Sequence, residues 1–290
     1  MAKILTKKER ERIANAVRGV LVVIVTVVLL FPLVIMAIRS FMTYDELYDG
    51  TLFPASFEWK NFYYKPLFDS FITWGGNTIT IALLNIIGIV SSSFLCAYGF
   101  AKVHFKFKGL IFAIMMGSTM LPSITLRIPL YRMYSEWGWL EGGSLKPLVI
   151  PAFFGGGALN VFLVMQFIKG IPNSTLESAR MDGANELRCL FSIVLPSCLP
   201  IVALISVNTF LGVWNDYSGP LIYLFNFEDK WTLALGYYMK ASDTMSNNPE
   251  GFTQNKQMAM GILMCIPPLI VFGCSQSLLI EGVSISGMKA

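Results

Sequence analysis

The residues whose types and spacing could do chemical or mechanical work are concentrated in one polar segment, residues 171–196, between two long apolar runs. Ser174 is followed three positions later by Glu177, a spacing that fits a capping box at the start of a helix. Pro172 prevents the preceding run from continuing as a helix. We therefore expect a short helix over residues 175–182, with Ser174 as its N-cap and Glu177 ordering the segment by capping.

A glycine divides this segment into two parts. Gly183 can adopt the left-handed conformation that commonly ends a helix, and a second short helix is expected over residues 185–191. The polar residues of the two helices are Glu177, Arg180, Asp182, Asn185, Glu186 and Arg188. Such an element could lie along a membrane surface or present a helix to a groove on another protein. The residue types and spacing alone do not distinguish these two possibilities.

Catalytic and metal-binding motifs are missing from the sequence. The single histidine, His104, cannot form a metal site by itself, and the five cysteines are scattered without a C-x-x-C pair, as small buried hydrophobic residues would be. No G-x-x-x-x-G-K loop followed by Ser or Thr occurs, so the chain has no standard ATP-phosphate site. The apolar runs contain no acid–base pair or nucleophile motif. We therefore expect no enzyme activity, no cofactor, no metal and no nucleic-acid partner.

The elements that must position the polar segment are membrane-spanning helices. Hydrophobic residues make up 54% of the 290 residues and charged residues 14%, whereas a soluble domain carries about 25% charged residues. A bilayer core of about 30 Å is crossed by about 20 helical residues. Six apolar runs of that order lie at residues 20–38, 76–101, 109–126, 147–168, 199–224 and 257–280. The sequence predicts an all-α, polytopic membrane protein with about six transmembrane helices.

The first run follows a basic stretch, as the core of a signal peptide would. It is too long for a typical signal-peptide core, and no A-x-A-like site follows it, so we favour a retained helix. The expected organisation is an N-terminal segment over residues 1–19, a transmembrane domain over residues 20–281 and a tail over residues 282–290.

Charge predicts the orientation of the helices. With six crossings both termini share one side, and the segments on that side are 1–19, 102–108, 169–198 and 281–290. They hold 13 Lys and Arg residues against 6 Asp and Glu, whereas the remaining residues hold 9 against 12. Because short basic loops stay in the cytoplasm, we expect cytoplasmic termini and a multi-pass protein of the cell membrane.

The outer segments are rich in aromatic residues, and two readings of them stay open. The aromatic residues of these segments include Tyr44, Tyr48, Trp59, Tyr63, Tyr64, Trp74, Trp137 and Trp139. They could form the aromatic belt that marks a membrane interface, or a surface for a sugar or a partner protein.

The polar segment also resembles a known family. The spacing of Glu177-Ser178-Ala179, Gly183 and Ile193-x-Leu195-Pro196 matches the EAA loop of binding-protein-dependent ABC importer permeases, with Ser178 where that family usually has alanine. The chain looks most similar to the maltose-transporter-type sugar permeases. Other similar stretches lie at residues 97–102, 107–109, 120–122, 129–131, 210–217 and 287–289. The resemblance implies the type I ABC importer permease fold.

In that family the EAA loop docks into a cleft on a cytoplasmic ATPase subunit, so the resemblance implies that residues 171–196 are a coupling segment. The implied coupling residues are Ser174, Glu177, Ala179, Asp182, Gly183, Asn185, Glu186 and Arg188, with Gly287, Met288 and Lys289 of the tail as secondary contacts. Asp182 and Gly183 would set the bend, while Glu186 and Arg188 would contact the ATPase. ATP would be bound by that partner and not by this chain.

The implied partners are a second homologous permease, an ATPase dimer, an extracytoplasmic solute-binding protein, the lipid bilayer and a carbohydrate such as an oligosaccharide. The carbohydrate path should lie between the two permeases. Candidate lining residues are Asn85, Asn160, Asn208, Trp214, Asn215 and Tyr217, together with Ser91, Ser92, Ser93 and Thr209. For each polar residue the alternative is a structural hydrogen bond between helices.

Two other functions compete with the importer. An ion- or proton-coupled secondary transporter needs ionisable groups within the membrane, and Asp216, near the outer end of its run, is the single such residue. A channel or a purely structural subunit is the other alternative. The EAA spacing argues against both.

Overall fold

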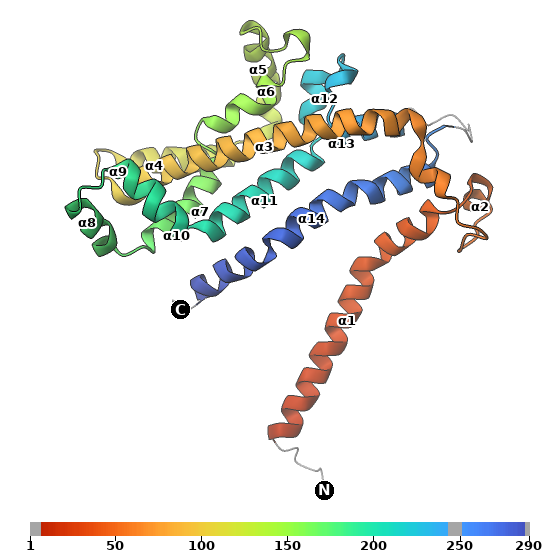
Figure 1. The fold of residues 1–290 in the computed structure, drawn as a ribbon, viewed down its shortest axis with the longest axis horizontal. Helices are drawn as coiled ribbons and strands as arrows, with labels where there is room; N and C mark the ends of the chain where they lie inside the picture. Colours follow the sequence, from red (N-terminus) through yellow and green to blue (C-terminus); the bar gives the residue numbers. More distant parts are fainter. Residues whose placement is uncertain (1–6, 243–250, 288–290) are drawn as a thin grey trace. The chain divides into compact units, whose positions relative to one another are not determined.

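A computed structural model describes residues 7–242 and 251–287, and every regular element in these ranges is a helix (Figure 1). The chain divides into two compact units. Unit 1 comprises Met1–Lys65 and Asp243–Cys265, and unit 2 comprises Pro66–Ser242 and Ile266–Ala290. The apolar runs form the long helices because a helix satisfies its own backbone hydrogen bonds where water is absent.

Unit 1 contains α1 (Lys7–Ser40), α2 (Tyr44–Tyr48), the 3-10 helix η1 (Trp59–Tyr63) and the first part of α14 (Gln254–Gly287). Buried side-chain amides hold its turns together. The Asn61 amide donates to the carbonyls of Ser40 and Met42 at 2.9 and 2.8 Å. The Asn255 amide donates to the same Met42 carbonyl at 2.9 Å. These bonds satisfy backbone carbonyls that no helix satisfies at the end of α1.

Helix α1 has the length and composition to cross a membrane over Glu11–Ser40. Its apolar side chains are exposed within the chain; Val28 and Leu29, for example, are 65% and 69% exposed. A helix that is hydrophobic all round belongs in lipid or against another apolar surface. Residues 1–6 of the expected N-terminal segment lie outside the described residues.

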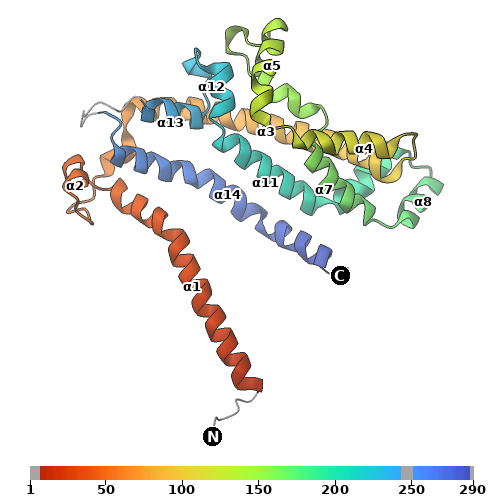
Figure 2. The same cartoon turned by 180° about the vertical axis from the view of Figure 1, so that it is seen from behind.

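Unit 2 contains most of the helices. They are α3 (Lys65–Lys102), α4 (Lys108–Gly117), α5 (Ser123–Glu136), α6 (Lys146–Val149), α7 (Ala158–Lys169), α8 (Asn173–Met181), α9 (Glu186–Cys189), α10 (Leu195–Ser197), α11 (Leu199–Asn215), α12 (Ser218–Leu224), α13 (Leu233–Ser242) and the second part of α14. Figures 1 and 2 show from opposite sides that α3, α7 and α11 lie side by side in this unit.

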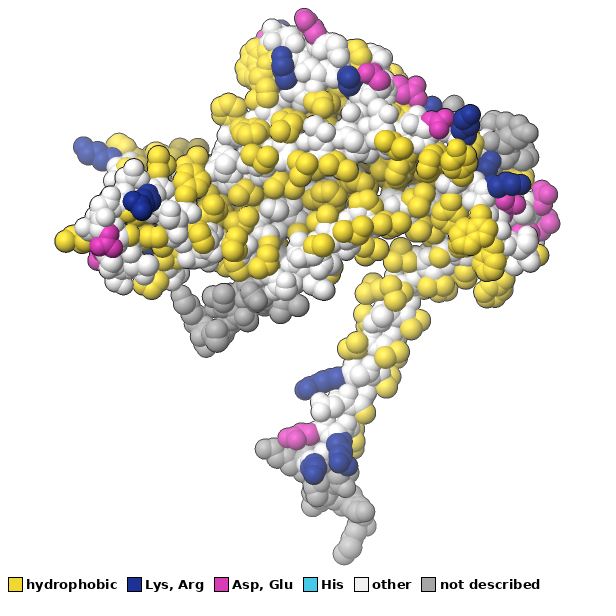
Figure 3. Space-filling view, viewed as in Figure 1, with side chains coloured by type: hydrophobic (Ala, Val, Ile, Leu, Met, Phe, Trp, Pro, Cys, Tyr) yellow, Lys and Arg dark blue, Asp and Glu magenta, His cyan; other side chains and the backbone are white. Residues whose placement is uncertain are grey.

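The core of unit 2 lies where these three helices meet the polar segment. Buried residues of α3, α7 and α11 pack there with Leu176 of α8 and Cys189 of α9. On the face shown in Figure 3, hydrophobic side chains cover the middle of unit 2, and charged side chains lie over α8 and over α5. This distribution suits a unit whose middle lies in lipid and whose ends lie in water.

The prediction of about six membrane-spanning helices is confirmed in a modified form. Within the described residues, four helices are long and apolar enough to cross a membrane, and six candidate spans result if two bent helix pairs each count as one. One bent pair ends the expected run 109–126 near Pro122, because Lys108–Met120 and Ser123–Glu136 meet at 99°. Pro122 is extended at the break, where it lacks the N–H that a continuing helix needs. The other bend, of 79°, separates Glu186–Ser197 from Leu199–Asn215.

The expected run 147–168 is interrupted by three glycines with positive φ. Gly155, Gly156 and Gly157 have φ of 89°, 61° and 83° between α6 and α7. At Gly156 the backbone approaches α3 so closely that an added Cβ would lie 2.6 Å from the Ile89 carbonyl oxygen and 2.7 Å from Ser93 Cβ. At Gly155 a Cβ would have no neighbour within 4 Å. Close packing thus restricts Gly156, and backbone conformation alone restricts Gly155.

The two short helices of the polar segment form, but the expected capping box does not. Helix α8 begins at Asn173 with Pro172 as its N-cap and no side-chain cap bond, so the predictions of Ser174 as N-cap and of Glu177 as its capping partner were wrong. A tertiary contact organises this start: Lys102 Nζ donates to Asn173 Oδ1 at 2.7 Å and to the Ile171 carbonyl at 2.9 Å.

The predicted glycine turn and the second helix are present. Gly183 has φ of 85°, the left-handed conformation expected of it. Helix α9 starts at Glu186, and its N-cap Asn185 accepts a hydrogen bond from the Arg188 backbone N–H at 2.8 Å. The chain then continues as a π-helix, Leu190–Val194, before α10.

We predict that Gly156→Ala destabilises the protein more than Gly155→Ala. Both variants place an L side chain at positive φ, which costs about 1–2 kcal/mol. Gly156→Ala adds an overpacking cost of about 1–3 kcal/mol against α3. Thermal unfolding of the purified protein in detergent should show a midpoint several degrees lower for Gly156→Ala, and equal midpoints would contradict the close approach.

We also predict that Asn185→Ala loosens α9 by about 1 kcal/mol, the usual cost of losing an N-cap side chain. Backbone amides of residues 186–189 should then exchange with deuterium faster than in the wild-type protein. Ser174→Ala is the matched control and should leave exchange in α8 unchanged, because Ser174 makes no cap bond. Faster exchange in α8 of the Ser174→Ala variant would instead support the predicted capping box of Ser174 and Glu177.

Candidate functional site

The coupling segment, residues 171–196, has a buried back and an exposed front. On the back, Leu176, Cys189 and Leu190 are at most 2% exposed and pack in the cluster that contains Ala97 and Tyr98 of α3. Ala179 is partly buried against the same cluster. An element packed in this way is held on one side and available for contact on the other.

The front of the coupling segment carries both charged and apolar groups. Glu177, Asp182 and Arg188 are exposed, and no hydrogen bond or ion pair of their side chains is found among the described residues. Met181, at the end of α8, is 88% exposed. An exposed apolar tip with charges around it is typical of a surface that another protein covers.

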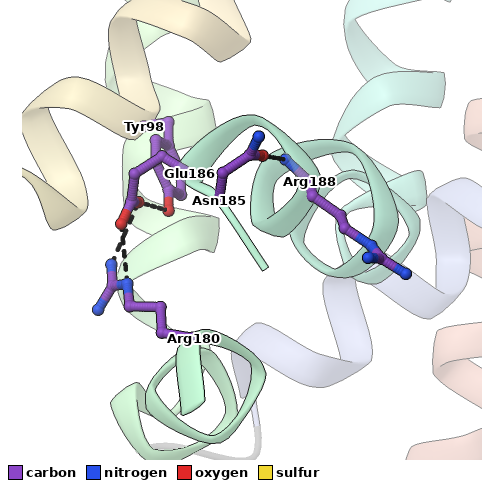
Figure 4. Close-up of polar contacts among 5 residues, drawn as sticks. All are labelled: Tyr98, Arg180, Asn185, Glu186 and Arg188. Atoms are coloured by element: carbon purple, nitrogen blue, oxygen red, sulfur yellow. Dashed lines mark hydrogen bonds and ion pairs between the residues drawn. The ribbon is translucent and has the colours of Figure 1, made fainter. Parts of the chain in front are cut away.

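Glu186 differs from these residues because its carboxylate is bound within the chain (Figure 4). Arg180 Nε donates to Glu186 Oε1 at 2.8 Å, and Arg180 Nη2 donates to Oε2 at 3.2 Å. The Tyr98 hydroxyl donates to the same Oε2. This bidentate hydrogen bonding with Glu186 raises the pKa of the Arg180 guanidinium above its usual value. The three residues come from α8, α9 and α3, so a single carboxylate joins three helices.

Sequence reasoning missed the parts of this arrangement that lie outside the polar segment. Tyr98 and Lys102 belong to α3 and are separated from Glu186 and Asn173 by 88 and 71 positions. One available signal was their spacing of four residues, which places both on one face of a helix. Of the tail residues, Gly287 is the last residue of α14, whereas Met288 and Lys289 lie outside the described residues.

A cavity of about 420 Å³ lies between the helices of unit 2. Its lining residues are Ile81, Asn85, Leu148, Gly212, Val213, Asn215, Asp216, Pro220 and Thr232. Asp216 is the one charged lining residue. Its Oδ1 accepts hydrogen bonds from the backbone N–H groups of Ser218 and Gly219, both at 3.0 Å, and so caps the first turn of α12 from the position before the N-cap residue Tyr217.

The structure brings together only two of the six residues predicted to line the substrate path. Asn85 and Asn215 both line the cavity. Trp214 is 3% exposed and stacks on Phe210 inside unit 2. Tyr217 stacks on Tyr238 with ring centroids 4.5 Å apart.

The remaining polar residues predicted to line the substrate path either make hydrogen bonds within the chain or are exposed. The Asn160 amide donates to the Gly156 carbonyl at 2.7 Å, while Asn208 is exposed. Ser91, Ser92 and Ser93 all bond carbonyls of their own helix, and Ser92 also bonds the Ala152 carbonyl at 3.0 Å. The alternative of a bond between helices thus holds for Ser92 and also for Asn85, which donates to the Leu148 carbonyl at 2.9 Å, whereas Ser91, Ser93 and Asn160 bond carbonyls three or four residues away.

Known proteins similar to this chain share its length and fold. The maltose/maltodextrin transport system permease protein MalG of Photorhabdus laumondii is 27% identical over 277 residues, covering 90% of this chain and 91% of the relative. The MalG proteins of Salmonella typhimurium and Escherichia coli K12 are 27% and 25% identical, with both chains fully covered.

Two solved structures have the same fold. One is a bacterial ABC transporter involved in the import of the acidic polysaccharide alginate, with a TM-score of 0.78, 22% identity and coverage of 95% of this chain and 99% of that one. The other is a bacterial alginate ABC transporter in complex with an alginate pentasaccharide-bound periplasmic protein, with a TM-score of 0.65, 16% identity and coverage of 92% and 94%.

A family model matches residues 90–285, which include α7, the coupling segment, the cavity-lining end of α11 and most of α14. This match covers more than half of the chain. The apolar helices and the fold agree with it, and the chain is a multi-pass membrane protein. It belongs to the family of binding-protein-dependent transport system inner membrane components.

Proposed function

We propose that this chain is one of two permease subunits of an ATP-driven importer of a carbohydrate, a neutral oligosaccharide that a solute-binding protein delivers. The observation that carries the proposal is the coupling segment: two short helices bent at Gly183, packed on α3 behind and exposed in front. A bent, exposed element of this kind in a transport-family membrane protein is suited to receive force from a partner.

The proposed source of that force is a cytoplasmic ATPase dimer. The sequence has no phosphate-binding loop, so ATP has to be bound elsewhere. Met181 supplies an apolar tip, and Glu177, Asp182 and Arg188 supply charges that a complementary cleft can pair. The basic loop 102–108 supports a cytoplasmic location for this end of unit 2 under the positive-inside rule.

Two observations support a carbohydrate as the cargo. The relatives described above are named for maltose and maltodextrin transport, and the proteins of similar fold for alginate import. The cavity of unit 2 is lined by Asn85 and Asn215, whose amide nitrogens already donate to carbonyls of the chain, so their side-chain oxygens are the groups that can accept from sugar hydroxyls. Because the charged group in its lining is the Asp216 carboxylate, a neutral sugar fits this cavity better than an acidic one.

The second candidate function, a secondary transporter, depends on Asp216 as a coupling group. The contacts of this carboxylate give it a structural role instead, since its Oδ1 accepts from the Ser218 hydroxyl at 3.1 Å and caps α12. A capping residue needs an acceptor oxygen but not a titratable proton.

Asp216→Asn tests the choice between the two functions. An asparagine keeps the capping acceptor and removes the charge, so we expect ATP-driven uptake by the assembled transporter within about twofold of wild type. Asp216→Leu removes the cap and should lower the thermal midpoint instead. Normal assembly of Asp216→Asn with complete loss of uptake would favour the secondary transporter.

Gly183→Asp tests docking of the coupling segment. The variant places a side chain at φ of 85° and a new carboxylate at the bend, so we expect normal membrane insertion but at least a tenfold loss of ATPase that co-purifies with the chain. Gly50→Asp is the matched control, because Gly50 has φ of 75° and open space around it in unit 1. Equal recovery of the ATPase with both variants would contradict docking at Gly183.

A further inference from the structure

The hydrogen bonds of Glu186 join the two short helices of the coupling segment to each other. Arg180 lies near the end of α8, and Glu186 is the first residue of α9, so their two hydrogen bonds join the two short helices across the turn at Gly183. Bidentate Arg–carboxylate contacts restrict orientation as well as distance. The bend is therefore held by a side-chain contact in addition to the backbone conformation of the glycine.

The coupling segment is also joined to α3 at two places. The Tyr98 hydroxyl bonds the Glu186 carboxylate, and Lys102 Nζ bonds Asn173 Oδ1 and the Ile171 carbonyl at the start of α8. Tyr98 and Lys102 are one helical turn apart, so the same face of α3 binds the start of α8 and the first residue of α9. Tyr98 is 5% exposed and holds its hydroxyl in place from the buried side, whereas the Glu186 and Arg180 side chains are 51% and 40% exposed.

Helix α3 continues from these bonds to the cavity. It is a single helix over Lys65–Lys102 and contributes Asn85 and Ile81 to the cavity lining. At 1.5 Å per residue, Asn85 lies about 20 Å along the helix from Tyr98. If the coupling segment and α3 keep a fixed relative position, a movement of the segment also moves the α3 residues that line the cavity.

We propose that Tyr98, Arg180 and Glu186 are positioning residues that make the coupling segment and α3 move as one body. The role of Glu186 is internal to the chain: its carboxylate holds the segment in place, and the exposed residues around Met181 make contact with the partner. The proposal rests on the proposed function, since the movement it transmits is the one that the ATPase would impose.

The test measures the distance between the segment and α3 in the assembled transporter. Spin labels at Leu187 of α9 and Leu83 of α3, both exposed, report this distance by pulsed electron resonance. The complex is measured without nucleotide and after trapping with ATP and vanadate. In the wild-type background we expect one narrow distribution that is the same in both states. Ser192, also exposed, replaces Leu187 if a label there blocks assembly.

The variants remove the contact one group at a time. Tyr98→Phe deletes only the hydroxyl and Glu186→Gln only the charge, and each should broaden the distribution or shift it by several ångströms in the trapped state. The double variant should change it no more than the larger single change, because both groups act through one contact. Tyr131→Phe is the matched control: Tyr131 is exposed and stacks on Tyr223, and the distribution should stay as in wild type.

The possible outcomes separate the two proposals. A wild-type chain that never co-purifies with an ATPase overturns the proposed function itself. An assembled complex in which Tyr98→Phe keeps the narrow, state-independent distance overturns only the positioning role. That role also fails if the wild-type distance changes between states, or if Glu186→Gln alone loses the ATPase, which would make Glu186 an interface contact.

Discussion

The structure depends on one constraint: in an apolar solvent, each backbone N–H and C=O must find its partner within the chain. Helices meet this constraint wherever the sequence allows them, and the long helices α1, α3 and α14 are the direct result. Where a helix breaks, other groups must replace the lost bonds. In unit 1 the amides of Asn61 and Asn255 bond carbonyls of Ser40 and Met42 where α1 ends.

The breaks of unit 2 are as important as its helices. Pro122 separates α4 from α5, and the three glycines at 155–157 separate α6 from α7. Asp216 ends α11 and caps α12, which brings its carboxylate to the wall of the cavity. Non-helical backbone at membrane depth is tolerated where it is buried in protein or lines a cavity. Gly156 is buried and Asp216 lines the cavity, whereas the break at Pro122 is exposed within this chain.

The coupling segment is held by a different kind of interaction from the helices. Its back is fixed by apolar packing of Leu176, Cys189 and Leu190, which has no preferred direction. Direction comes from the hydrogen bonds of Glu186 and Lys102 to fixed partners. Packing alone would let the segment slide on α3, whereas directional bonds to a buried tyrosine define one position. In the proposed importer, a segment held by directional hydrogen bonds can transmit movement to α3, whereas a segment held by apolar packing alone would only be attached to it.

The sequence by itself determined the helical class, the membrane-spanning runs, the left-handed turn at Gly183 and the place of the coupling segment between two runs. These features follow from local composition, from periodicity and from the special conformations of glycine and proline, all of which a sequence displays directly. Only the tertiary structure decided where α8 begins, because Lys102 of a distant helix binds Asn173 and overrides the local capping signal of Ser174 and Glu177. It also decided that Glu186 bonds Tyr98, and that Asn85 and Asn215 share a cavity while Trp214 is buried in the core. Such contacts join residues tens of positions apart, and their geometry arises only when the helices pack.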